Sequence, residues 1–191
     1  MDYICHYDSP LGGITMCSDG QALTGLLFDD EEYFDETIGA QRGSRTNCGD
    51  SGIPAFAETL LPVFAETVRW MDVYFSGKDP GFLPPIALRT TPFRREVCEI
   101  MLTIPYGETI TYGDIAKVIA KRRGIERMSA QAVGGAVGHN PISLIIPCHR
   151  VVGTNGSLTG YAGGIDKKIK LLKLEGADLT DLFVPASGTA L

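Results

Sequence analysis

Hydrophobic and polar positions alternate over short stretches at the start of the chain. The segments 3–9, 13–18 and 22–29 are short, partly alternating and separated by turn sequences. Asp19-Gly20 is the strongest hairpin signal among those turns, because this pair tolerates the positive φ angles of a tight hairpin. The pattern therefore predicts that the chain begins with β-strands.

The spacing of apolar residues then becomes helical. The stretch 31–54 is polar, contains glycine and has no period, so we expect a loop there. Residues 55–77 have apolar positions at helical spacing; Pro62 would begin or kink a helix, and Gly77 would stop it. The proline-rich stretch 78–85 is typical of a linker.

Four segments of the second half have helical spacing and capping residues at their ends. We expect helices from Pro92 after the cap Thr91, over 111–120, from the cap Ser129 to near Gly138, and over 165–175 before Gly176. Between the last two helices, residues 142–147 form an apolar run that we expect to be a buried strand, and 153–164 reads as a loop. The residues after Gly176 should be loosely ordered.

Composition and charge narrow the class of protein. Of 191 residues, 44% are hydrophobic and 21% charged, as in ordinary globular proteins, and no apolar run approaches the ~20 residues that cross a bilayer. The start of the chain has no pattern of an export signal, so we expect a cytoplasmic protein with free thiols. Residues 1–90 carry 14 acidic and 5 basic side chains, whereas 91–176 carry 7 acidic and 12 basic. This asymmetry suggests two modules, of which the second could meet phosphates.

The helices predicted over 111–138 have the outline of a helix-turn-helix, which binds DNA through its second helix. Glycine costs about 1 kcal/mol relative to alanine inside a helix, so a helix this rich in small residues needs a compensating contact. The contact could be a neighbouring helix, or a minor groove about 6 Å wide. Nearby arginines favour DNA. The small residues are Ala130, Ala132, Gly134, Gly135, Ala136 and Gly138, and the arginines are Arg122, Arg123 and Arg127.

Cys148 is the candidate nucleophile, and it is followed directly by His149. A thiol needs a base or a positive field to become the reactive thiolate. Adjacent residues on a strand point to opposite faces, so His149 could act only through a turn around Pro147–His149 or through a bridging water. A histidine base also needs a partner that fixes its tautomer. Glu175 is a candidate, although a glutamate at a helix end is commonly solvated.

Metal binding is the other chemistry that cysteine and histidine offer. The chain has three histidines, and its remaining cysteines lack the paired spacing of zinc sites. We therefore expect no metal. Cys5, Cys17 and Cys98 fit small core residues better.

Three segments of the second half together closely resemble one family. The segments "PYGETITYGDIA", "NPISLIIPCHRVVGTNGSLTGYAGG" and "KKIKLLKLEG" are similar to the O6-alkylguanine-DNA alkyltransferases, also called methylated-DNA–protein-cysteine methyltransferases. The likeness is specific over residues 90–176 and looser over 1–30. It implies an RNase H-like α/β N-terminal domain (1–85), a mostly helical C-terminal domain with a winged helix-turn-helix (86–176), and a tail (177–191).

The resemblance also implies the reaction. A DNA repair protein of this kind moves a methyl or other alkyl group from O6 of guanine, or less well from O4 of thymine, to Cys148. The thioether is not regenerated, so each molecule acts once and no cofactor is needed. The target atom lies inside the duplex, so the base must be flipped out. We expect a monomer that binds double-stranded DNA containing O6-alkylguanine through the minor groove.

Family roles carry over to matching positions of this chain. Cys148 would accept the alkyl group, His149 would act as a base through a water, and Glu175 would hold His149. Tyr112 would line the pocket and assist loss of the guanine. Backbone carbonyls of Cys148 and Val151 would accept the guanine amino group, the N–H of Ala162 would face O6, and Asn140 would be a hinge. The remaining substrate- and DNA-binding residues would be Ala130, Gln131, Gly134, Gly135, Tyr161 and Gly163, with Arg150 supporting structure or charge.

The chain departs from the family pattern at two positions. Gln131 stands where the family usually has an arginine that fills the gap left by the flipped base. An amide can still fill space and hydrogen-bond to the partner base, but it lacks the guanidinium charge and stacking face. Cys98 stands where we expect a large aromatic residue, and we interpret it as core.

Three alternative functions remain open. A non-catalytic alkyl-DNA sensor of this fold would lack the cysteine that is present at Cys148. A Cys–His–Glu hydrolase would not need the small-residue helix and its basic neighbours. A transcriptional regulator built on the helix-turn-helix would carry an additional metal-bearing sensor module.

Overall fold

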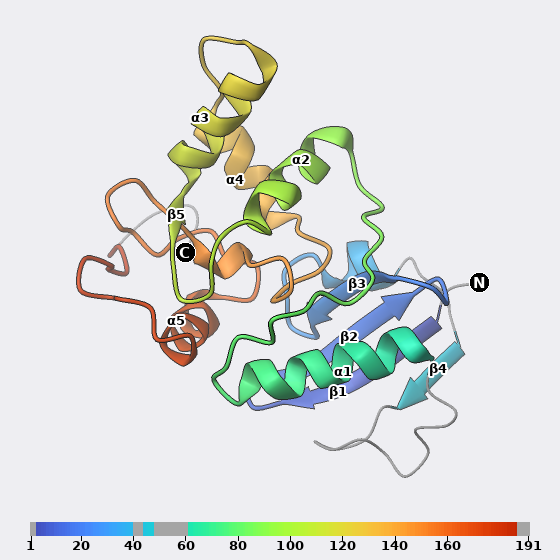
Figure 1. Ribbon diagram of the computed structural model, residues 1–191. Helices are drawn as coiled ribbons and strands as arrows, with labels where there is room; N and C mark the ends of the chain where they lie inside the picture. Colours follow the sequence, from blue (N-terminus) through green and yellow to red (C-terminus); the bar gives the residue numbers. More distant parts are fainter. Residues whose placement is uncertain (1–2, 40–43, 48–60, 187–191) are drawn as a thin grey trace. The chain divides into compact units, whose positions relative to one another are not determined.

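The computed structural model describes residues 3–39, 44–47 and 61–186 (Figure 1). The chain divides into two compact units. The first contains Met1–Arg89 with the short segment Pro141–Ser143, and the second contains Thr90–Asn140 with Leu144–Leu191. No helix within the described ranges is long and apolar enough to cross a bilayer.

A four-stranded sheet with the order β3-β2-β1-β4 forms the first unit. The strands β1 (Tyr3–Ser9), β2 (Gly12–Ser18) and β3 (Leu23–Phe28) are antiparallel, and β4 (Ser44–Asn47) runs parallel to β1. The expected β-strands and the turn at Asp19 are therefore present, since the Asp19 N–H donates to the Ala22 carbonyl between β2 and β3.

Helix α1 (Pro62–Phe75) lies along one face of this sheet (Figure 1). Its inward side chains include Phe64, Met71 and Tyr74, which are almost fully buried. The Tyr7 hydroxyl donates to an Asp72 carboxylate oxygen at 2.8 Å and links β1 to the helix. Pro62 begins the helix, where its missing N–H has no cost.

The prediction of a loop over 31–54 is wrong for two parts of this stretch. Asp35–Gly39 forms a short π-helical turn, and Ser44–Asn47 forms strand β4. The sequence of β4 is polar, so no apolar period predicted it; backbone pairing with β1 along Tyr3–His6 holds it. Part of the helix expected over 55–77 lies outside the described residues.

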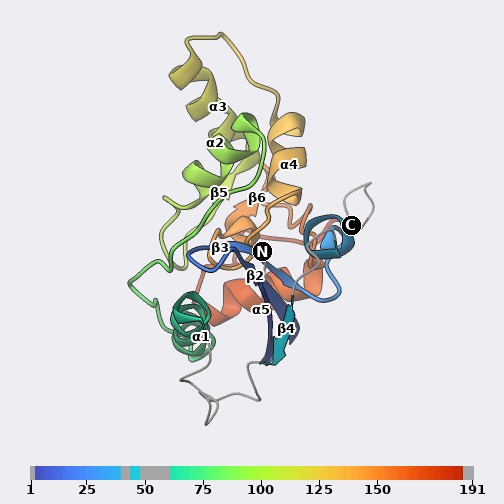
Figure 2. The same ribbon diagram turned by 90° about the vertical axis from the view of Figure 1, so that its right-hand side faces the viewer.

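Helices make up most of the regular structure of the second unit. Figures 1 and 2 both show α2, α3 and α4 next to one another. The elements are α2 (Pro92–Met101), β5 (Ile110–Thr111), α3 (Tyr112–Arg123), α4 (Ala130–Gly138), a 3-10 turn (Cys148–Arg150), β6 (Val151–Val152) and α5 (Ile165–Leu174). The two short strands β5 and β6 pair in parallel, which the sequence did not predict.

Side-chain caps explain where three of these helices begin. The hydroxyls of Thr91, Thr111 and Ser129 each accept a backbone N–H of the first turn. Helix α3 extends further than 111–120 and ends at Gly124, which has φ +63°. Lys121, Arg122 and Arg123, which lie beyond the helix expected over 111–120, are therefore helical.

The buried strand expected over 142–147 is wrong. This segment consists of turns with a single bridge, between Leu26 and Ile142, and Leu144 has φ +68°. Every residue from Asn140 to Arg150 is nevertheless buried. An apolar run predicts burial, but it does not by itself distinguish a strand from other buried backbone.

The part of the tail that is described, 177–186, packs onto the second unit rather than lying loose. The Phe183 N–H donates to the Gly156 carbonyl, and the Phe183 carbonyl accepts from Leu158 at 2.8 Å. Leu179 and Leu182 pack against the cluster formed by Val152, Leu158 and Leu172. Apolar residues among polar ones gave no period from which this could be predicted.

The cysteines differ in part from the expectation of free thiols. Cys17, Cys98 and Cys148 are buried and form no disulfide. Cys5 is buried as well, but it is disulfide-bonded. Burial raises the pKa of Cys98 to about 12, as suits a core thiol.

The close approach of the tail to Gly156 generates a stability prediction. A Cβ at Gly156 would overlap the carbonyl oxygen of Asp181, and the residue has φ +84°. Gly124 also has a positive φ, but a Cβ there meets nothing. Left-handed backbone costs both alanine variants about 1–2 kcal/mol, so only the overlap with Asp181 distinguishes them. We expect Gly156→Ala to lower the melting temperature by about 5 °C more than Gly124→Ala. Equal shifts in thermal unfolding would show that the tail does not pack there.

Candidate functional site

A tight turn presents Cys148 and His149. Pro147 precedes a 3-10 turn over Cys148–Arg150, which separates adjacent side chains by about 120° instead of placing them on opposite faces of a strand. Cys148 is 5% exposed and His149 is fully buried. The turn that His149 would need in order to act on Cys148 is therefore present.

The carboxylate of Glu175 is at the centre of a buried polar cluster. Glu175 caps the end of α5, and its Oε1 accepts from His149 Nε2 at 2.6 Å. Its Oε2 accepts from Arg150 Nε at 2.8 Å and from the Gly107 N–H at 3.2 Å. Arg150 also donates to Glu175 Oε1 at 3.1 Å and to the Ile104 carbonyl at 2.7 Å. Glu175 is thus a buried hydrogen-bond acceptor and not a solvated helix end.

The charges in this cluster are set by its geometry. Burial by itself raises the pKa of Glu175, but the hydrogen bonds and charges of His149 and Arg150 outweigh it and lower the pKa to about 2. Burial lowers the pKa of His149, against the opposing effect of Glu175. At neutral pH the carboxylate is therefore ionised and the imidazole neutral. An ionised carboxylate only accepts, so Nε2 carries the proton and Nδ1 is a basic nitrogen.

Asn140 connects the end of α4 to Cys148. It follows His139, which ends the helix, is buried, and donates from Nδ2 to the Ile146 carbonyl at 2.8 Å and to Cys148 Sγ at 3.2 Å. One side-chain amide therefore fixes the buried turns before the cysteine and touches the sulfur itself.

Lys168 is a buried cation that the sequence analysis missed. Its Nζ donates to the carbonyls of Val151 at 2.6 Å and Thr159 at 2.7 Å, and burial lowers its pKa to about 8. A signal was available, because Lys168 shares the spacing of Ile165 and Leu172 on the apolar face of α5. A lysine at such a position is expected to be buried and therefore to need hydrogen-bond acceptors.

Tyr112 is the first residue of α3, and its side chain shares the Thr159 carbonyl with Lys168. Its hydroxyl donates to the Thr159 carbonyl at 3.0 Å and to the Gly160 carbonyl at 3.2 Å, and Lys168 Nζ is 6.0 Å from its ring centroid. Burial, and the nearby Cys148, raise the pKa of Tyr112. The phenol therefore stays protonated and remains a donor.

The loop residues predicted for the site lie beside this cluster. The Tyr161 ring meets His149 edge to face at 6.5 Å between centroids. A Cβ at Gly163 would lie 2.7 Å from the Tyr161 ring, so only glycine fits beside it. Ala162, between them, is partly exposed.

Helix α4 presents its small residues to solvent. Val133, Ala136 and Val137 are buried, whereas Ala130, Gln131 and Gly135 are exposed. A Cβ at Gly135 would meet nothing within 4 Å, and one at Gly134 would meet only Tyr112, at 4.0 Å. The exposed face is therefore not used for close packing on a neighbouring helix within the described residues.

The predicted site residues thus form two groups. Contacts join the first group, and the second lines the outer face of α4. Among the described residues, no three His, Cys, Asp or Glu side chains are arranged to hold a metal ion. The first group is Cys148, His149, Glu175, Asn140, Arg150, Val151, Tyr161 and Gly163, together with Tyr112 through the loop carbonyls, and the second is Ala130, Gln131, Gly134 and Gly135.

Both units match domains of one known family. Residues 3–88 match the 6-O-methylguanine DNA methyltransferase, ribonuclease-like domain, and residues 92–177 match the DNA binding domain of the same family. The chain belongs to the 6-O-methylguanine DNA methyltransferase family. This confirms the expected resemblance, and it gives the first unit a ribonuclease-like fold and the second a DNA-binding fold.

Individual members of the 6-O-methylguanine DNA methyltransferase family are similar over nearly the whole chain. A methylated-DNA–protein-cysteine methyltransferase of Methanosarcina acetivorans is 47% identical, over 92% of this chain and 99% of its own length. One from Mycobacterium tuberculosis is 41% identical, over 92% of this chain and 97% of its own length. A crystal structure of M. tuberculosis OGT in complex with DNA superposes with a TM-score of 0.70 at 38% identity, over 91% of this chain and 92% of that one.

The lowered pKa of Glu175 predicts acid lability. A carboxyl group with a depressed native pKa contributes stability that is present above its unfolded pKa, near 4.5, and is lost as the pH falls toward about 2. The difference corresponds to about 3 kcal/mol. We expect the melting temperature of the wild type to fall through this window more steeply than that of Glu175→Gln. Parallel curves for the two proteins between about pH 5 and pH 2.5 would contradict the assignment.

Proposed function

We propose that Cys148 accepts an alkyl group from O6 of an alkylated guanine in DNA. The chain is a DNA alkyltransferase by family, and a repair protein that acts once per molecule. The observation that carries the assignment of the cysteine is the buried hydrogen-bonded chain from Glu175 to His149 beside Cys148. It supplies a neutral base, held in one tautomer, next to a thiol that forms no disulfide.

The reaction follows from these protonation states. His149 takes the Cys148 proton through a bridging water at Nδ1, because Nε2 is engaged with Glu175. The thiolate attacks the alkyl carbon, so a C–S bond forms while the C–O6 bond breaks with its electron pair remaining on the guanine. The guanine takes up a proton and leaves as the normal base. The thioether has no leaving group, which makes the transfer irreversible.

Two cations support the charges that develop. The Lys168 ammonium and a Cys148 thiolate favour each other electrostatically. Arg150 keeps Glu175 ionised, so the imidazolium that forms on His149 meets a carboxylate. Arg150 therefore serves the site from within the protein, and not by binding DNA.

Tyr112 and the loop backbone would recognise the base. The protonated phenol of Tyr112 would donate to guanine N3 as the base leaves, after releasing the carbonyls of Thr159 and Gly160. The Cys148 carbonyl accepts from the Val151 N–H, and the Val151 carbonyl accepts from Lys168. Each carbonyl has a second lone pair, so both can still accept the guanine amino group. The N–H of Ala162 would face O6.

Helices α3 and α4 would bind the duplex as a winged helix-turn-helix. The exposed small face of α4 fits a minor groove about 6 Å wide, and its glycines leave room for the backbone to approach the sugar edges. Gln131, exposed on that face, would fill the gap left by the flipped base. Asn140 would couple this helix to the cysteine. O4-alkylthymine would be the weaker substrate.

The remaining assignments are also proposals. We assign residues 1–85 to the N-terminal domain, 86–176 to the DNA-binding and transfer domain, and 177–191 to the tail. The protein would act as a monomer in the cytoplasm. A sensor without transfer and a hydrolase are both disfavoured, the first by the presence of Cys148 and the second by family membership.

Intact-protein mass spectrometry tests the transfer. With an oligonucleotide duplex containing O6-methylguanine, we expect a gain of about 14 Da, one methyl in place of a hydrogen, on the peptide that contains Cys148. The gain should saturate at one per molecule. Cys148→Ala should bind the duplex and gain no mass, whereas Cys98→Ala should still gain it. Transfer that survives in Cys148→Ala would refute the assignment, and continued turnover would indicate a hydrolase.

Substitution of Gln131 tests the role of α4. We expect Gln131→Arg to speed single-turnover transfer on duplex DNA several-fold, because a guanidinium adds charge and a stacking face. On a single-stranded oligonucleotide there is no base stack to fill, so the rate there should change much less. An unchanged duplex rate, or an equal gain on both substrates, would count against insertion at this position.

A further inference from the structure

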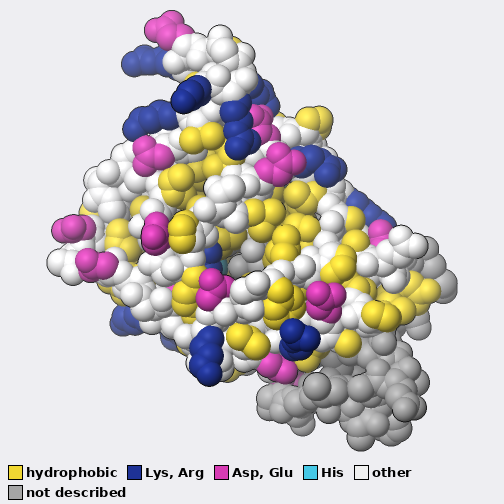
Figure 3. Space-filling model, viewed as in Figure 1, with side chains coloured by type: hydrophobic (Ala, Val, Ile, Leu, Met, Phe, Trp, Pro, Cys, Tyr) yellow, Lys and Arg dark blue, Asp and Glu magenta, His cyan; other side chains and the backbone are white. Residues whose placement is uncertain are grey.

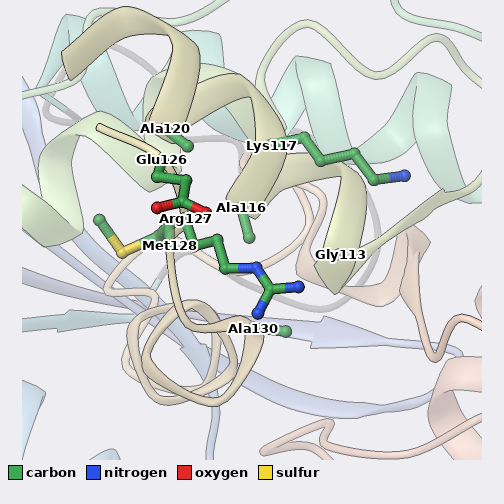
Figure 4. A pocket seen from close by; sticks show the side chains of 8 residues that line it. All are labelled: Gly113, Ala116, Lys117, Ala120, Glu126, Arg127, Met128 and Ala130. Atoms are coloured by element: carbon green, nitrogen blue, oxygen red, sulfur yellow. The ribbon is translucent and has the colours of Figure 1, made fainter. Parts of the chain in front are cut away.

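A hollow beside α4 contains a cation that the proposed reaction does not use. It measures about 480 Å³ and lies between α3 and the connection that leads into α4 (Figure 4). Its floor is made by small side chains, which leave room for an external group. The residues that line it are Gly113, Ala116, Lys117, Ala120, Glu126, Arg127, Met128 and Ala130.

Arg127 is the charge available in this hollow. Figure 4 shows its guanidinium extending toward the side formed by Gly113 and Ala130, away from the carboxylate of Glu126. Within the part of the chain that the structure describes, Arg127 makes no ion pair. Lys117 also lines the hollow, but its ammonium group is bound to Asp114 at 2.8 Å.

The surroundings of the hollow are positively charged. Lys121 and Arg122 are exposed at the end of α3, and neither has an ion-pair partner among the described residues. Arg123 is engaged, since it donates twice to Glu96 and covers the Phe93 ring. Figure 3 shows Lys and Arg side chains gathered over this end of α3. An uncompensated arginine among further cations favours an anionic partner.

The position of the hollow specifies which anion. Ala130 lines the hollow and also begins the exposed face of α4, one residue before Gln131. A helix that enters a minor groove has a phosphate backbone on each side of it, so groups beside its first turn meet phosphates. Arginine binds phosphate oxygens with two parallel N–H donors.

We propose that this hollow is a subsite for one DNA backbone phosphate, with Arg127 as its main ligand and Lys117 as a secondary one. The inference rests on the proposed contact of α4 with the minor groove. It also explains how the chain tolerates Gln131. Charge that Gln131 does not supply inside the base stack is supplied by Arg127 outside it, on the backbone.

The salt dependence of DNA binding tests the subsite. The variant Arg127→Gln removes the charge at an exposed position, and Lys170→Gln on the exposed side of α5 is the matched control. Binding of a fluorescent duplex is measured across a series of salt concentrations. We expect Arg127→Gln to weaken binding of lesion-bearing and undamaged duplexes equally. The slope of log K against log salt should become shallower by about 0.9, the value for one phosphate, while Lys170→Gln leaves it unchanged.

Single-turnover transfer supplies the second readout. At saturating duplex, Arg127→Gln should reach the wild-type maximal rate, because a phosphate contact acts on affinity and not on the transfer step. An unchanged salt slope, a slope lowered equally by Lys170→Gln, or a lower maximal rate would each overturn the subsite. If the wild type itself neither binds duplex DNA nor gains mass, the proposed function fails instead.

Discussion

The ionised carboxylate of Glu175 is the constraint on which the second unit depends. It accepts hydrogen bonds from His149, Arg150 and the Gly107 N–H, so it joins the end of α5, the turn that contains the cysteine and the connection after α2. Arg150 extends the network to the Ile104 carbonyl. A buried charge left without its partner costs about 3–5 kcal/mol, so these stretches of chain are held in place together. The same carboxylate orients the base of the proposed reaction, which means that stability and chemistry share one group.

Local chemistry in the sequence predicted much of the fold. Thr91 and Ser129 cap the helices that they were expected to cap, because a hydroxyl before a helical stretch satisfies a backbone N–H in any context. The hairpin at Asp19-Gly20 is specified equally locally. The partnership of His149 with Glu175 spans 26 residues; the residues alone offered Glu175 as one candidate, and the family resemblance selected it.

What the sequence could not predict depends on contacts between distant segments. The parallel pair β5–β6 is two residues long in each strand and has no period. The turns over 141–147 are as apolar as a buried strand, and Leu144 adopts a positive φ without a glycine to announce it. Helical spacing predicted α5, but it did not reveal the buried Lys168, whose two carbonyl partners come from the separate stretches around Val151 and Thr159.

Helix α5 also sets the distance between two buried charged groups. Lys168 and Glu175 are seven residues apart, close to two full turns, so both point toward the same side with their Cα atoms about 10 Å apart along the axis. Inserting or deleting one residue between them would rotate one group by about 100° relative to the other. The side chains of Lys170 and Lys173 face solvent, so they can be exchanged without moving either buried group, whereas the number of residues between Lys168 and Glu175 cannot change. Within this helix, the spacing of two charges matters more than the identity of the residues between them.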